Sequence, residues 1–206
     1  MITRRFLYLL LAILPLCSHA QDYNYNDSIA RYWQQYKNDF LTDAHSPLTA
    51  EDTAYLRFYP TNAAYSITTH FTRTPDSKPF TMLTHSGTRK NYSEYGYATF
   101  KVKGTTCTLH IYQAIDLIKK DSKYNDYLFI PFTDETNYKE TFGGGRYLDL
   151  STKEIHGDKL VIDFNKCYNP YCAFKGGYAC PIPPKENDLS ISIEAGEKLF
   201  GKEVKE

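Results

Sequence analysis

The sequence predicts a mainly β protein, an antiparallel sandwich or a partly closed barrel of about 8–10 strands with one N-terminal amphipathic helix. Hydrophobic and polar residues alternate over many short segments, which is the period of a half-buried strand. Aromatic residues, which favour strands, make up 16% of the 206 residues. No regularly spaced helices separate these segments, which argues against a doubly wound α/β fold.

Residues 1–20 resemble a secretory signal peptide. Arg4 and Arg5 precede an apolar run at 6–16, and Ser18-His19-Ala20 offers small residues before a cleavage point at Gln21. The run is shorter than the roughly 20 residues that a spanning helix needs. Lipid attachment at Cys17 is disfavoured because Leu16, rather than a small residue, precedes it. We therefore expect an exported protein, periplasmic or secreted, with no transmembrane segment after cleavage.

The remaining residues, 21–206, are expected to form one β-rich domain. A helix is predicted at about 28–41, because Ile29, Trp33, Tyr36 and Phe40 lie on one helical face. Strands are predicted at 65–72, 80–84, 94–102, 105–112, 127–132, 145–150, 159–164 and 189–194. In the segment 105–112, Cys107, Leu109 and Ile111 are expected to share one face, opposite Thr106, Thr108, His110 and Tyr112.

Four cysteines follow the signal peptide, at 107, 167, 172 and 180. Cys172 and Cys180 enclose a short loop with two glycines, so they are predicted to form a disulfide in an oxidising compartment. Free thiols and a thiolate metal site are the alternatives. The spacing of Cys167, Cys172 and Cys180 matches no standard zinc motif, and no metal is expected.

A group of polar residues lies among the strands at 129–187. Arg146 shares a strand face with Leu148 and Leu150, so its guanidinium is expected to point inward and to pair with Asp134, Asp149 or Asp163. The candidate residues for a pocket or polar hub are Asp134, Thr136, Arg146, Tyr147, Asp149, Asp163, Asn165, Tyr168, Asn169, Glu186 and Asn187.

Three segments within 129–198 carry a resemblance to a known family: FTDETNYKETFGGGRYLDL, DFNKCYNPYCAF and CPIPPKENDLSISIEAGEK. They resemble the bacterial domain-of-unknown-function family 1684 (DUF1684), with agreement at many positions in the same order. Departures include Phe142, where tyrosine is usual, and Cys167, where alanine is usual. The family has no established activity, so the resemblance implies the extent of the domain and leaves its function open.

The sequence supports two hypotheses about function. The first is a cell-envelope module that binds an unidentified small ligand or serves a structural role. The alternative is a hydrolase or lyase-like enzyme with Asp134, Asp163 or Glu186 as acid or base and Arg146 binding an anionic group. A nucleic-acid partner is not expected, because Lys and Arg together number 24, as do Asp and Glu. No cofactor is expected, because the sequence has neither a phosphate loop nor a dinucleotide-binding motif.

Overall fold

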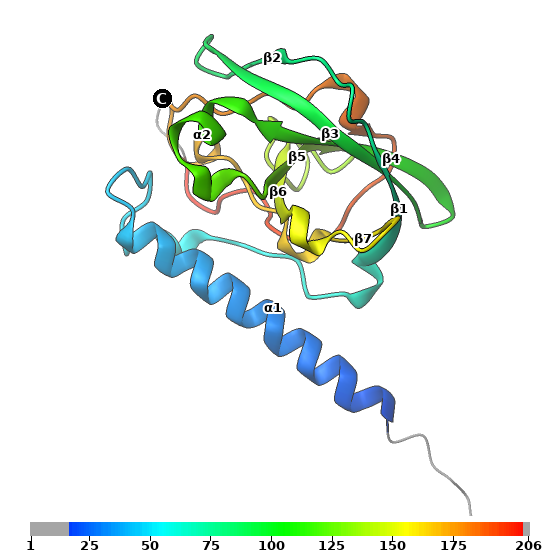
Figure 1. The fold of residues 1–206 in the computed structure, drawn as a ribbon. Helices are drawn as coiled ribbons and strands as arrows, with labels where there is room; N and C mark the ends of the chain where they lie inside the picture. The colour runs from blue at the N-terminus through cyan, green and yellow to red at the C-terminus, as the bar shows by residue number, and fades with distance from the viewer. Residues whose placement is uncertain (1–16, 204–206) are drawn as a thin grey trace, which may run out of the picture.

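The structure is a computed structural model that describes residues 17–203. Figure 1 shows a curled sheet with one long helix on one side of it, whose N-terminal end projects away from the sheet. The predicted signal peptide lies outside the described residues except for its last four, which begin this helix. Within residues 17–203, no helix is both long enough and apolar enough to cross a membrane.

The α-helices are α1 (Cys17–Thr42) and α2 (Ile115–Lys120). The strands are β1 (Ser66–Arg73), β2 (Phe80–Leu83), β3 (Arg89–Val102), β4 (Thr105–Ala114), β5 (Tyr127–Asp134), β6 (Arg146–Ser151), β7 (Lys159–Asp163) and β8 (Asp188–Leu189). Short 3-10 helices lie at Asp52–Tyr55, Ala63–Tyr65, Ser122–Tyr124, Thr152–Glu154, Phe164–Lys166, Tyr171–Ala173 and Lys185–Asn187.

The strands form one sheet in the order β6-β5-β4-β3-β1-β7, with every neighbouring pair antiparallel. β2 pairs with the first part of β3, and β8 makes a short parallel pair with β5. The sheet curls into a half-barrel, so the fold prediction is confirmed in its partly closed barrel form.

The long strand β3 contains a bulge between Glu94 and Gly96. A bulge bends its strand and increases the local twist, which suits a curled sheet. A Cβ atom at Gly96 would collide with the carbonyl oxygen of Thr72 in β1, so the close approach of these strands requires glycine.

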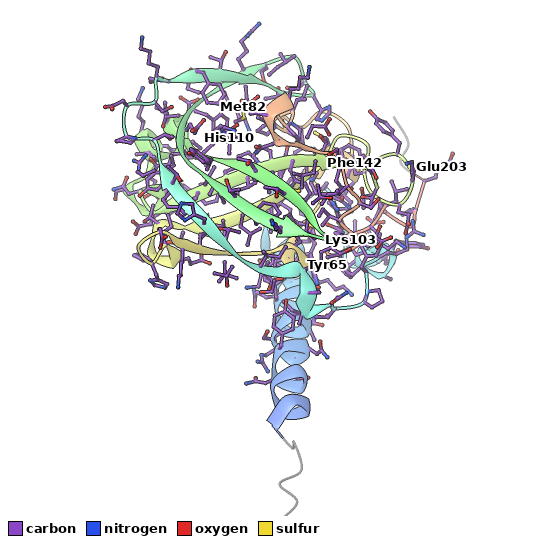
Figure 2. All side chains as sticks on the ribbon, turned by 90° about the vertical axis from the view of Figure 1, so that its right-hand side faces the viewer. Tyr65, Met82, Lys103, His110, Phe142 and Glu203 are labelled. Atoms are coloured by element: carbon purple, nitrogen blue, oxygen red, sulfur yellow. The ribbon has the colours of Figure 1, made fainter. Side chains whose placement is uncertain are left out.

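Aliphatic and aromatic side chains from the concave face of the sheet form the main core. Leu109 and Ile111 of β4 and Leu128, Ile130 and Phe132 of β5 are fully buried there, and the shared face predicted for Leu109 and Ile111 is confirmed. Each fully buried side chain of this kind stabilises the fold by about 1.5–3 kcal/mol. In Figure 2, Lys103 lies beside Tyr65 where β3 turns into β4, and its ammonium is 5.7 Å from the centre of the Tyr65 ring.

Helix α1 is longer than the predicted helix and lies against the segment that follows it. Trp33 is 8% exposed, and its ring centroid lies 4.1 Å from that of Phe58. Phe40 packs in a separate apolar cluster with Leu48, Leu56 and Phe174. The C-terminal half of α1 is therefore held by aromatic contacts.

The predicted strand at 189–194 is wrong over most of its length. Only Asp188–Leu189 pairs with the sheet, and residues 190–194 form an irregular segment. The carbonyl oxygen of Ile193 accepts a hydrogen bond from the Arg146 guanidinium instead of from a neighbouring strand.

Candidate functional site

The side chains of β6 alternate between two environments. Arg146 and Leu148 are buried in the main core, whereas Tyr147 and Asp149 point to the opposite face, which α1 covers. This alternation divides the predicted polar group into a sealed part and a part that lines a cavity.

The sealed part is centred on Arg146, whose side chain has no accessible surface. Its guanidinium pairs with the Asp134 carboxylate at 2.5 Å and donates to the carbonyl oxygens of Ile193 and Ala195. The predicted inward orientation and the pairing with Asp134 are confirmed. Asp134 also accepts a hydrogen bond from the backbone N–H of Thr136. These bonds join β6 to the C-terminal segment, and no anion from solvent can reach the guanidinium.

Asp163 and Asn165 lie at the end of β7, where they hold other segments in place. The Tyr25 hydroxyl of α1 donates to Asp163 at 2.9 Å. The Asn165 amide donates to the carbonyl oxygen of Asn62, also at 2.9 Å. The two residues therefore attach α1 and the segment before β1 to the end of the sheet.

Asn187 and Glu186 lie at a third location. The buried Asn187 amide exchanges two hydrogen bonds with the backbone of His110 and donates a third to the carbonyl oxygen of Pro131. Glu186 is exposed and accepts from the Tyr112 hydroxyl at 3.3 Å.

The three carboxylates proposed as acid or base are thus in three separate environments. Asp134 is neutralised by a buried arginine, Asp163 accepts from a tyrosine of α1, and Glu186 faces solvent. Because Arg146 is sealed in the core, it cannot hold an anionic group beside any of them, which is the role that the enzymatic alternative gave it.

A cavity of about 610 Å³ opens between α1, β6 and the segment 166–181. Six tyrosines line it: Tyr32, Tyr36, Tyr147, Tyr168, Tyr171 and Tyr178. Of the sequence-predicted candidates, the structure places Tyr147, Asp149 and Tyr168 here. The two tyrosines of α1 were missed, although their spacing of four residues places them on one helical face.

Each of these six tyrosine hydroxyls already donates to a protein acceptor. The acceptors are the carbonyl of Lys166 for Tyr32, Glu197 for Tyr36, the carbonyl of Pro181 for Tyr147, Asp149 for Tyr168, Asp43 for Tyr171 and the carbonyl of His45 for Tyr178. The bonds fix the rings, which present mainly their faces and edges to the cavity.

Asp149 lies at the floor of the cavity. Its Oδ1 atom accepts from the hydroxyls of Tyr127 at 2.7 Å and Tyr168 at 2.9 Å. The carboxylate is reachable by solvent, yet protein atoms surround it, and this burial raises its pKa against the opposing effect of the two hydroxyls. Among the described side chains, no basic group forms an ion pair with it.

Sequence reasoning also missed Glu197, which is fully buried behind the cavity wall. Its Oε2 atom accepts from the backbone N–H of Asn169 at 2.7 Å and from the Tyr36 hydroxyl at 2.9 Å. Burial raises the pKa of Glu197 to about 8. The one available signal was its position in the family-like segment 195–198.

The predicted disulfide between Cys172 and Cys180 is not formed, and both residues are free thiols. The loop does bring them together, since the backbone N–H of Cys172 lies 3.2 Å from the sulfur of Cys180. The Cys172 thiol donates to the carbonyl oxygen of Tyr178, at 3.0 Å.

Comparisons with known proteins place the chain in a family and show its fold. A family described as "Protein of unknown function (DUF1684)" matches residues 52–198. An uncharacterised protein of Haloarcula marismortui, solved by solution NMR, is 23% identical, with a TM-score of 0.66 over 87% of this chain and 96% of that one. At this identity the likeness concerns the fold alone. No match was found among curated proteins.

Proposed function

We propose that this chain, which belongs to the DUF1684 family of proteins of unknown function, is an exported protein that binds a small organic molecule in the cavity between α1 and β6. The observation that carries the proposal is the cavity itself. A space of about 610 Å³ is in the range of sites for small ligands.

The lining of the cavity supports a preformed binding site. Its tyrosine rings are held by hydroxyl bonds to backbone carbonyls and carboxylates, so few side chains need to be ordered when a ligand enters. An apolar lining with one polar group at its floor is the usual composition of a small-molecule site. Asp149 supplies that polar group.

The N-terminal sequence supports export. Arg4 and Arg5, the apolar run at 6–16 and Ala20 before the expected cleavage point together have the form of a signal peptide. Cleavage before Gln21 would remove only the first four residues of α1 and would leave Tyr25 and all the cavity-lining residues in place.

Two variants on adjacent residues of α1 test the binding site. Gln35 lines the cavity, whereas Gln34 does not, and each is exposed and bonds to the residue four positions later. Gln35→Trp is expected to fill the cavity mouth, and Gln34→Trp is the matched control. Compounds that stabilise the wild-type protein in a thermal-shift screen should lose their effect on Gln35→Trp and keep it on Gln34→Trp.

The proposal is overturned by either of two results. A broad screen of metabolites that yields no stabilising compound would contradict a ligand-binding role. Compounds that stabilise both tryptophan variants as well as the wild-type protein would bind elsewhere on the molecule, so the cavity would not be the site.

A further inference from the structure

We infer that the ligand of this cavity is a small organic cation, whose substituted ammonium group lies against the tyrosine rings with Asp149 as its counter-ion. This inference rests on the proposed function and names the chemical class of the ligand. It follows from the charge of the floor, the faces of the rings and the hydrogen-bonding groups that the cavity leaves free.

The negative charge of the Asp149 carboxylate is not paired with a basic side chain among the described residues. Asp149 is exposed to solvent, and its neighbours at hydrogen-bonding distance are the neutral hydroxyls of Tyr127 and Tyr168. A carboxylate with no basic partner attracts a cation that approaches it. Because no described basic side chain pairs with it, a cation entering the cavity would supply the missing partner.

The ring faces offer a second attraction for a positive charge. Tyrosine faces carry negative electrostatic potential and bind ammonium groups within about 6 Å of the ring centre. The protein already uses one ring in this way, because the ammonium of Lys166 lies 5.8 Å from the centre of the Tyr32 ring. Tyr36 and Tyr168 lie next to one another in the same cavity, with ring centroids 6.0 Å apart.

The hydrogen-bonding groups at the floor favour a ligand that brings its own positive charge or donors. The Tyr147 hydroxyl donates to the carbonyl oxygen of Pro181, and the Tyr168 hydroxyl donates to the Asp149 carboxylate, so neither is free to donate to a ligand. A neutral polyol such as a sugar would need donors from the floor as well as acceptors. An anionic ligand would meet the Asp149 carboxylate.

Charges of both signs line the rest of the cavity. Lys90 and Lys166 are basic, and Asp39 is acidic and accepts from Gln35. The remaining wall therefore carries a net charge of +1, and the negative charge opposite it is that of Asp149. This distribution orients an ammonium group inward, towards Asp149.

A pair of probes of nearly the same shape tests the inference. Choline carries a trimethylammonium group, and 3,3-dimethylbutan-1-ol replaces its nitrogen with carbon and has no charge. We expect choline to bind wild-type protein at least about tenfold more tightly than the neutral alcohol, as measured by ligand-observed NMR titration.

Two carboxylate variants locate the source of the preference. Asp149→Asn keeps an acceptor for Tyr127 and Tyr168 but removes the charge, so choline affinity should fall about tenfold while that of the alcohol stays within about twofold. Asp39→Asn removes the same charge elsewhere in the cavity and is the matched control. It should change choline affinity by less than about twofold, because the Asp39 carboxylate accepts from the Gln35 amide rather than from the tyrosines that surround Asp149.

The outcomes separate this inference from the proposed function. Equal binding of the two probes, or choline binding that survives both Asp149→Asn and Gln35→Trp, would overturn the cation inference. If neither probe binds while another compound binds in a manner that Gln35→Trp abolishes, the inference fails and the proposed function stands. If no compound binds at all, both fail.

Discussion

The Glu197 carboxyl group lies in the interior with its Oε1 atom unbonded to any described residue. The Oδ1 atom of Asn169, whose backbone N–H bonds the other oxygen of Glu197, is likewise unbonded. Burial raises the pKa of Glu197 to about 8, so the folded protein keeps this proton at pH values where the unfolded chain has lost it.

This difference in proton binding makes stability depend on pH. The full contribution of the protonated carboxyl is present below about pH 4.5, and it is lost as the pH rises towards 8. The free energy of unfolding should fall across this range by up to about 1.4 kcal/mol per pH unit, as measured by urea unfolding in a series of buffers. Glu197→Gln should remove most of that slope, and an unchanged slope in the variant would contradict the assignment.

The buried pair of Arg146 and Asp134 leads to a second prediction. Arg146→Ala leaves Asp134 charged and unpaired in the core, so the free energy of unfolding should fall by about 3–5 kcal/mol. Arg146→Lys should also destabilise, because an ammonium cannot reach both the carboxylate and the carbonyls of residues 193–197.

Urea unfolding of both variants measures this effect. The exposed Arg31 provides the control, and Arg31→Ala should change stability by less than about 0.5 kcal/mol. An Arg146→Ala protein as stable as wild type would show that the pair does not support the fold.

At the scale of single elements, β6 shows how far sequence reasoning reaches. The alternation of Arg146 and Leu148 with Tyr147 and Asp149 predicts correctly which side chains face the core. The partner of the other face could not be predicted, because the tyrosines of α1 that complete the cavity are more than 100 residues away along the chain. No local pattern encodes which helix covers which strand.

Two other elements show where local patterns mislead. The segment 189–194 alternates like a strand, yet the carbonyl oxygen of Ile193 bonds to Arg146, so a tertiary contact overrides the local preference. The short loop between Cys172 and Cys180 predicts their proximity correctly. It does not predict the bond, which depends on where each sulfur points.

The attachment of α1 can be tested at adjacent positions. Phe40 is 3% exposed and packs on Phe174, whereas Leu41 is 53% exposed. Phe40→Ala should lower the free energy of unfolding by about 3–5 kcal/mol, and Leu41→Ala by less than about 0.5 kcal/mol. Chemical unfolding followed by the fluorescence of Trp33, the single tryptophan, measures both. Equal effects of the two substitutions would show that α1 is not held through Phe40.

At the scale of the whole molecule, export predicts the start of the mature chain. When the full sequence is expressed in a Gram-negative host, the protein should be recovered from the periplasm with Gln21 as its first residue. Intact-mass measurement should find residues 1–20 removed and no lipid attached. A cytoplasmic protein that retains residues 1–20 would contradict the prediction.

Three tyrosines of α1 form hydrogen bonds with residues near the other end of the chain. Tyr25, Tyr32 and Tyr36 bond to Asp163, Lys166 and Glu197, each more than 130 positions further along the chain. During synthesis the helix emerges before the strands it covers, and these three bonds can form only after nearly the whole chain has been produced. The cavity between α1 and β6 is therefore completed late in folding, and a chain that stops before residue 163 leaves all three tyrosines without their acceptors.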